Sequence, residues 1–137
     1  MAAAVLRPLL KDRPVAAIAN GIDLDAWRRP DPSPGRPDAP VEFVSVTRLQ
    51  KRKRARWLVR AFAEATRGLP EAAARLTIVG DGDEMGAIGR IIRRGGLGGR
   101  VVLAGRQPRE AIRDLLHRSD VFVLASRLEA FGIAALE

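Results

Sequence analysis

Four short apolar runs, separated by segments with helical spacing, constrain the fold of this chain most strongly. They are rich in β-branched residues and occupy residues 41–46, 76–79, 101–103 and 121–124. Runs that are apolar at nearly every position are typical of strands buried on both faces, as in parallel sheets. A shorter run at residues 15–18, closed by the turn pair Asn20-Gly21, is a further strand candidate.

The segments between these runs have the periodicity of helices. Their apolar positions are Leu58, Ala61, Phe62 and Ala65; then Met85, Ile88 and Ile92; then Ile112, Leu115 and Leu116. Gly95-Gly96 predicts the end of the second helix, and Pro108 is expected as the first residue of the third. The alternation predicts an α/β fold, a Rossmann-like open parallel sheet with helices on both faces.

Length and composition limit the classes of function. The 137 residues amount to one domain, and a hydrophobic content of 47% excludes a disordered tail. Without cysteine there is no disulfide, thiolate nucleophile or cysteine zinc site, and His117 alone forms no metal site. The start, MAAAVLRPLL, is too short an apolar stretch for a signal peptide or a membrane span. We therefore expect a cytoplasmic location.

A proline-dense stretch divides the chain into two parts. Residues 28–40, RRPDPSPGRPDAP, are typical of an exposed loop or linker. They predict an N-terminal segment, residues 1–40, with a short strand and a Pro-rich loop, followed by a sheet domain at residues 41–137. The net charge of +8 indicates an anionic partner, either nucleic acid, a phosphorylated small molecule or an acidic surface. Arginines that merely solvate helix faces would explain the same charge.

Small and charged residues follow the predicted strands at one edge of the sheet. They are Thr47-Arg48-Leu49, Gly80-Asp81-Gly82, Ala104-Gly105-Arg106 and the segment from Ala125 to Glu129. Ligands of such sheets bind beyond the carboxyl ends of the strands. Arg48 and Lys53, near a helix start, could neutralise a diphosphate. Alternatively, the run KRKRAR at residues 51–56 is a solvated loop or contacts nucleic acid.

Glu129 and Glu137 are separated by seven residues. If a helix begins near Phe131-Gly132, the amides of Phe131, Gly132 and Ile133 are unpaired donors for phosphate oxygens. The two carboxylates would then accept hydrogen bonds from hydroxyl groups on either side of that phosphate. A capping glutamate and a surface glutamate would have the same spacing.

An ordered set of motifs resembles one enzyme family. It consists of NGID at residues 20–23, TRL with Lys53, IVGDG at 78–82, VLAG at 102–105, DVFVLAS at 120–126, and EAFG at 129–132 followed by Glu137. From about Val15 to the last residue, the chain looks like the donor-binding domain of glycosyltransferase family 4 (glycosyl transferases group 1). These are retaining enzymes with the GT-B fold.

The resemblance assigns roles to single residues. It implies that Arg48 and Lys53 bind the donor diphosphate, that Glu129 is the catalytic carboxylate at the sugar hydroxyls, and that Glu137 holds the ribose. The remaining implied contacts are the phosphate-binding amides of Phe131, Gly132 and Ile133 and the base-proximal pair Arg106-Gln107. It further implies a nucleoside-diphosphate sugar as the donor, no metal and no cofactor, and transfer that retains the anomeric configuration, with the leaving diphosphate stabilised electrostatically.

The match has departures and missing parts. Thr47, Arg54 and Ala130 stand where glycine is common in the family, and Asp83 stands where proline is common. We expect the chain to be truncated, without the N-terminal acceptor domain of the family and without the part that follows the second glutamate, and to transfer no sugar alone. The acceptor is unidentified, and peripheral membrane association of the full enzyme is open.

Other readings fit the sequence less well. Asp81-Gly82-Asp83 is expected as a tight turn rather than a metal motif, and the third glycine after Gly80 and Gly82 comes one residue too late for a dinucleotide fingerprint. His117 is expected at the surface or at the C-terminal end of its helix, and Trp27 and Trp57 in packing positions. With aromatic residues at 4%, a nucleic-acid partner is disfavoured.

Overall fold

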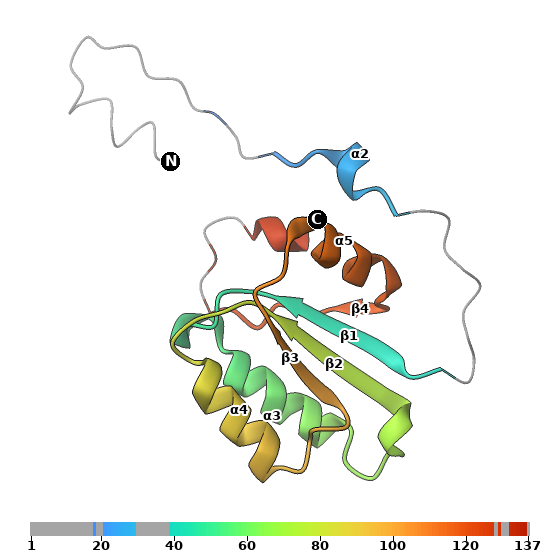
Figure 1. Cartoon of the computed structure of the whole chain (residues 1–137), viewed down its shortest axis with the longest axis vertical. Coiled ribbons are helices and arrows are strands. Elements are labelled where there is room, and N and C mark those ends of the chain that lie inside the picture. Colours follow the sequence, from blue (N-terminus) through green and yellow to red (C-terminus); the bar gives the residue numbers. More distant parts are fainter. Residues whose placement is uncertain (1–17, 19–20, 30–38, 128, 130–131, 137) are drawn as a thin grey trace, which may run out of the picture.

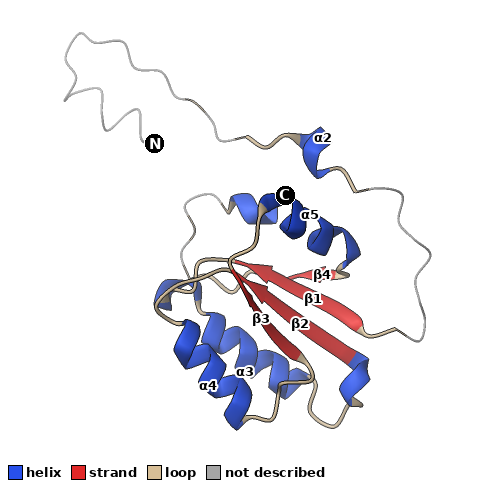
Figure 2. Ribbon diagram, viewed as in Figure 1, coloured by secondary structure: helices blue, strands red, loops and turns tan. Residues whose placement is uncertain are grey.

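The computed structural model of the chain describes residues 18, 21–29, 39–127, 129 and 132–136. Its centre is a parallel sheet in the order β3-β2-β1-β4. The strands are β1 (Val41–Val46), β2 (Ala74–Val79), β3 (Val101–Gly105) and β4 (Val121–Phe122). Helices α3 (Ala55–Ala65) and α4 (Met85–Arg94) cover one face, and α5 (Arg109–Arg118) covers the other (Figures 1 and 2). The predicted α/β sheet with helices on both faces is confirmed.

Shorter elements connect this framework. They are helix α2 (Leu24–Trp27) and the 3₁₀ turns η1 (Lys51–Lys53), η2 (Glu71–Ala73) and η3 (Ile133–Ala135). Asp23 caps α2, because its carboxylate accepts hydrogen bonds from the amides of Asp25 and Ala26 at 3.1 Å. No helix in the described part of the chain is both long and apolar enough to cross a membrane. A cytoplasmic location stays a prediction, as does the division at residue 40.

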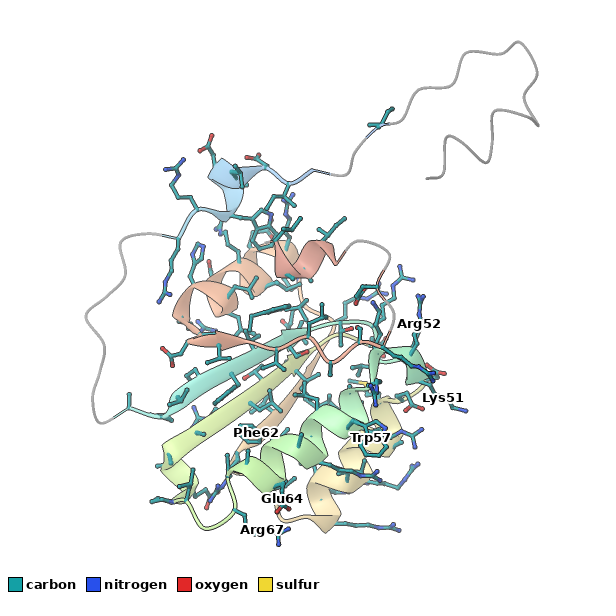
Figure 3. All side chains as sticks on the ribbon, turned by 180° about the vertical axis from the view of Figure 1, so that it is seen from behind. Lys51, Arg52, Trp57, Phe62, Glu64 and Arg67 are labelled. Carbon is teal, nitrogen blue, oxygen red and sulfur yellow. The ribbon has the colours of Figure 1, made fainter. Side chains whose placement is uncertain are left out.

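The main core lies between the sheet and the α3–α4 layer. Leu76 and Ile78 of β2 are fully buried there, against Val59 of α3 and Ile88 of α4. Phe62 of α3 packs edge-to-face on Phe43 of β1, with 5.6 Å between the ring centroids (Figure 3). Each such side chain contributes about 1.5–3 kcal/mol by its burial. This core fixes α3, and with it the preceding loop.

An ion pair joins the beginnings of α3 and α4. Arg56 donates from Nε and Nη2 to both oxygens of Glu84, which precedes α4 and is only 7% exposed. These hydrogen bonds hold the pKa of Glu84 below its ordinary value, against the opposing effect of burial. The amide of Glu84 also donates to the carbonyl of Leu49 at 2.9 Å. The segment after β1 is thus attached to both helices of the layer.

Several local predictions are wrong. Trp57 is 60% exposed, because at about 100° per residue it lies on the side of α3 opposite the buried Ala55 and Phe62. Ala61 and Ala65 also face solvent, and Ala55 and Val59 are buried instead. Pro108 precedes α5 as its N-cap, with an extended ψ of 160°. Residues 123 and 124 lie outside β4, which pairs with β1 only at Phe43 and Val44.

Other predictions hold or fall outside the described residues. Trp27 is buried at 7% exposed. His117 lies in the last turn of α5, half-buried, with Nε2 3.4 Å from the Trp27 carbonyl oxygen. Of the strand predicted at residues 15–18, only Ile18 lies within the described residues, and it is 91% exposed and outside any strand.

Candidate functional site

The loops that follow β1, β2 and β3 form one connected edge. The Thr47 amide donates to the Val79 carbonyl at 3.0 Å, and the Leu49 amide donates to Asp81 at 2.9 Å. The Gly80 amide donates to the Gly105 carbonyl at 2.8 Å. Because backbone hydrogen bonds link the β1 and β2 loops to each other and to the end of β3, the side chains that they carry are held at defined positions on the carboxyl edge of the sheet.

Two glycines permit this close approach of backbones. A Cβ at Gly80, where φ is +137°, would lie 1.8 Å from the carbonyl oxygen of Thr47. A Cβ at Gly82, where φ is +154°, would lie 2.5 Å from the carbonyl oxygen of Leu49. The Gly82 amide donates to Oδ1 of Asp81 at 2.7 Å, within the turn predicted for residues 81–83. Any side chain at either position would separate the β1 and β2 loops.

A pocket of about 270 Å³ opens at this edge. Its lining consists of Val46, Thr47, Arg48, Val79, Gly80, Asp81, Arg106, Gln107 and Ile112. Arg48, Arg106 and Gln107, predicted to contact the diphosphate and the base, therefore lie around one cavity. The Gln107 amide donates to the Ala104 carbonyl at 2.7 Å, which fixes its side chain at the cavity wall.

Lys53 and Glu129, to which the sequence assigns separate donor contacts, also contact each other. Lys53 Nζ donates to Glu129 Oε1 at 2.5 Å, and the two side chains are 14% and 26% exposed. Ser126 Oγ donates to the same oxygen at 2.7 Å. These bonds, that from Lys53 above all, hold the pKa of Glu129 below its ordinary value, although partial burial acts in the opposite direction. Glu129 is therefore ionised at neutral pH and can accept hydrogen bonds from hydroxyl groups.

The segment after Glu129 differs from the expected α-helix. Gly132 has a left-handed φ of +74°, and a 3₁₀ turn follows, with the Ala135 amide donating to the Gly132 carbonyl at 2.8 Å. A Cβ at Gly132 would approach only Leu124, at 3.9 Å, so in this conformation the glycine is explained by its φ. Ile133 is 40% exposed. Phe131 and Glu137 lie outside the described residues.

Sequence reasoning placed Ser126 and Asp81 at the carboxyl edge of the sheet but gave neither residue a role in the site. Ser126 carried a usable signal, because it follows β4 at the carboxyl edge three residues before Glu129. Asp81 was assigned to a turn, which it forms, and it also lines the pocket. No three acidic or histidine side chains in the described ranges lie close enough together to hold a metal ion. The absence of a metal in the working protein stays a prediction.

Comparison with known families decides the identity of this fold. The family model described as "Glycosyl transferases group 1" matches residues 29–137, which include every strand and every predicted site residue. The chain belongs to that family. The glycosyl transferases group 1 model therefore confirms the resemblance carried by the motifs from Thr47 to Glu137.

Individual curated proteins are similar to this chain over part of their length. N-acetyl-alpha-D-glucosaminyl L-malate synthase of Bacillus anthracis is 33% identical over 95 residues, 69% of this chain and 24% of its own. A phosphatidylinositol N-acetylglucosaminyltransferase subunit from Arabidopsis thaliana is 31% identical over 97% of this chain and 29% of its own. The chain thus spans about a quarter of the length of these relatives.

A solved structure of a glycosyltransferase has a similar fold. The pneumococcal O-GlcNAc transferase GtfA, crystallised with UDP and GlcNAc, superposes with a TM-score of 0.61 and 29% identity. The match covers 69% of this chain and 18% of GtfA. The described sheet is therefore a Rossmann-like part of the kind found in group 1 glycosyltransferases.

Proposed function

We propose that this chain is the donor-binding part of a retaining glycosyltransferase and binds a nucleoside-diphosphate sugar at the carboxyl edge of its sheet. The observation that carries the proposal is the gathering of Arg48, Arg106 and Gln107 around one pocket of about 270 Å³. The ion pair of Lys53 and Glu129 follows β1 and β4 on the same edge. The crystallisation of GtfA with UDP supports this ligand class.

In this proposal, different residues bind different parts of the donor. Arg48 offers a planar guanidinium with paired N–H groups, which suits phosphate oxygens. Lys53 has three N–H donors and donates one of them to Glu129. It can therefore keep that contact while it donates another to a phosphate. The proposed phosphate contacts include the amides of Phe131, Gly132 and Ile133, with Glu137 on the ribose. Fixed cations in this arrangement would stabilise a leaving diphosphate without a metal ion.

Glu129 is the proposed catalytic carboxylate. Held by Lys53 and Ser126 and ionised at neutral pH, it can accept hydrogen bonds from donor-sugar hydroxyls. A fixed negative charge at this place can also stabilise positive charge developing on the sugar during transfer that retains configuration. That the 137 residues transfer no sugar alone stays a prediction.

The nucleic-acid alternative loses one of its cations. Within the run at residues 51–56, Arg56 is paired with Glu84 through both carboxylate oxygens. The remaining cations are not accompanied, in the described part of the chain, by a series of exposed aromatic rings on which bases could stack. We therefore do not propose that function.

Titration of the chain with UDP, ADP and GDP by calorimetry tests donor binding. We expect at least one nucleotide to bind and Arg48→Gln to weaken it about tenfold or more, because a charge-assisted hydrogen bond is removed. Arg75→Gln is the matched control, with the same charge change on β2 beside Glu42 of β1, away from the carboxyl edge. Absence of binding, or equal loss in both variants, would contradict the assignment.

A further inference from the structure

A second hollow lies beside the donor edge and has no part in the proposed donor contacts. Its volume is about 430 Å³, and it is lined by Lys51, Arg52, Arg54, Trp57 and Arg127. These residues come from η1, the start of α3 and the loop after β4. The Arg127 amide donates to the Arg52 carbonyl at 3.0 Å and holds the two segments together. We call these residues, with Arg60, the Trp57 surface.

The Trp57 surface carries cations that form no salt bridge with the described residues. Its hollow has four cationic side chains and, among the described lining residues, no carboxylate. Salt bridges between described residues engage the neighbouring Lys53 and Arg56, but none of the cations of the Trp57 surface. A concave surface with charge of one sign attracts an anionic partner.

Trp57 itself is exposed where packing was expected. Its side chain faces outward from α3, on the same side of the molecule as Lys51 and Arg52 (Figure 3). The guanidinium groups of Arg54 and Arg60 lie over its ring, at 5.9 and 5.7 Å from the centroid. Because these arginines stand three residues before and after Trp57, the indole lies between two cations along the helix.

This combination suits the interface of a membrane. Tryptophan is enriched at the boundary between lipid and water, because its ring is apolar and its N–H is polar. Lysine and arginine beside such a ring are attracted to anionic headgroups. A single-stranded nucleic acid fits less well, because a base would have to displace a guanidinium to stack on the exposed indole of Trp57. Trp57 is 60% exposed, so its ring can enter the interface between lipid and water.

We propose that the Trp57 surface docks the protein on an anionic phospholipid membrane, with Trp57 in the headgroup layer and the surrounding cations on lipid phosphates. Glu129 contacts Lys53, directly between Arg52 and Arg54 in the sequence, so docking here would bring the proposed donor site next to the bilayer. The inference is independent of donor binding, because it uses other side chains.

Tryptophan fluorescence and vesicle sedimentation test this docking on the intact chain. Trp27→Phe leaves Trp57 as the one indole reporter. In about 0.1 M salt, we expect binding and a blue shift with vesicles of phosphatidylcholine and phosphatidylserine, but not of phosphatidylcholine alone. Each cation removed should weaken binding about fivefold, so Arg52→Gln with Arg127→Gln should lose about 25-fold by the same measure. Trp57→Ala should abolish most of the remainder.

The net charge of +8 makes a charge-matched control necessary. Arg75→Gln with Arg93→Gln removes the same two charges from β2 and from the end of α4, and should leave vesicle binding nearly unchanged. Equal loss in the two double variants, or equal binding to neutral vesicles, overturns the proposal. A single-stranded oligonucleotide that binds more tightly than the vesicles overturns it in favour of nucleic acid. Nucleotide titration of the double variant Arg52→Gln with Arg127→Gln measures its donor binding, so that a loss of vesicle binding can be told apart from a loss of donor binding.

Discussion

At the scale of single residues, the carboxylate of Glu129 is the most strongly organised group of the site. One of its oxygens accepts hydrogen bonds from Lys53 at 2.5 Å and from Ser126 at 2.7 Å. Both bonds favour the ionised form, and so lower the pKa of Glu129. A carboxylate fixed in this way keeps its charge and its direction when a ligand arrives.

Titration of the side-chain carboxyl carbons by NMR tests this arrangement. Glu129 should titrate below the ordinary glutamate range, and Lys53→Gln should raise its pKa more than Ser126→Ala, because the Lys53 bond is the larger influence. Lys51→Gln, a neighbouring cation that does not contact Glu129, is the control. A pKa of Glu129 that is the same with and without Lys53 would refute the pairing.

The contribution of the Lys53–Glu129 contact to the free energy of unfolding depends on pH. Because the pKa of Glu129 is depressed on folding, the contribution is complete above the ordinary glutamate pKa and is lost as the pH falls through the pKa of the folded state. The difference in unfolding free energy between the original chain and Lys53→Gln should therefore shrink in acid.

At the scale of elements, the β1 and β2 loops depend on backbone contact that only glycine allows. We expect Gly80→Ala to lower the free energy of unfolding by about 3 kcal/mol or more, because its Cβ would collide with the backbone of Thr47 at an unfavourable φ. Gly86→Ala within α4 meets only the end of Arg90 at 3.7 Å and should stabilise by about 0.5–1 kcal/mol. Chemical denaturation measures both changes, and a neutral Gly80→Ala would show that the loops are further apart than described.

Strands and long helices were predictable, and short or exposed features were not. The apolar run at residues 41–46 gave the bounds of β1 correctly, although only Val44 and Ser45 at its centre are fully buried. The spacing of Leu58 and Phe62 located α3. The alanines of the pattern did not show which of the neighbouring positions face the sheet. Four-residue α2 and three-residue η1 have too few positions to produce a period. Trp57 was misplaced because an indole suits both a core and an interface.

At the scale of the whole molecule, the order β3-β2-β1-β4 explains how distant residues form one edge. Parallel strands end on the same side of the sheet. Arg48 and Arg106 therefore line one pocket, although they are 58 positions apart in the sequence. Sequence reasoning placed Arg48, Lys53 and Glu129 around one common pocket. In the structure Arg48, Arg106 and Gln107 line the pocket, whereas Lys53 and Glu129 pair with each other and are not among its described lining residues. The turn at Gly132 was not predictable, because it depends on a local φ that the sequence pattern does not specify.

Amide chemical-shift mapping with UDP tests the location of the donor site most directly. In two-dimensional NMR spectra of the intact chain, we expect UDP to shift the amides of residues 47–49, 80–82, 106–107 and 126–129. The amides at the amino ends of β1 and β2 serve as the internal reference and should stay in place. Shifts confined to those amino ends, or no shifts at saturating UDP, would contradict a donor site at the carboxyl edge of the sheet.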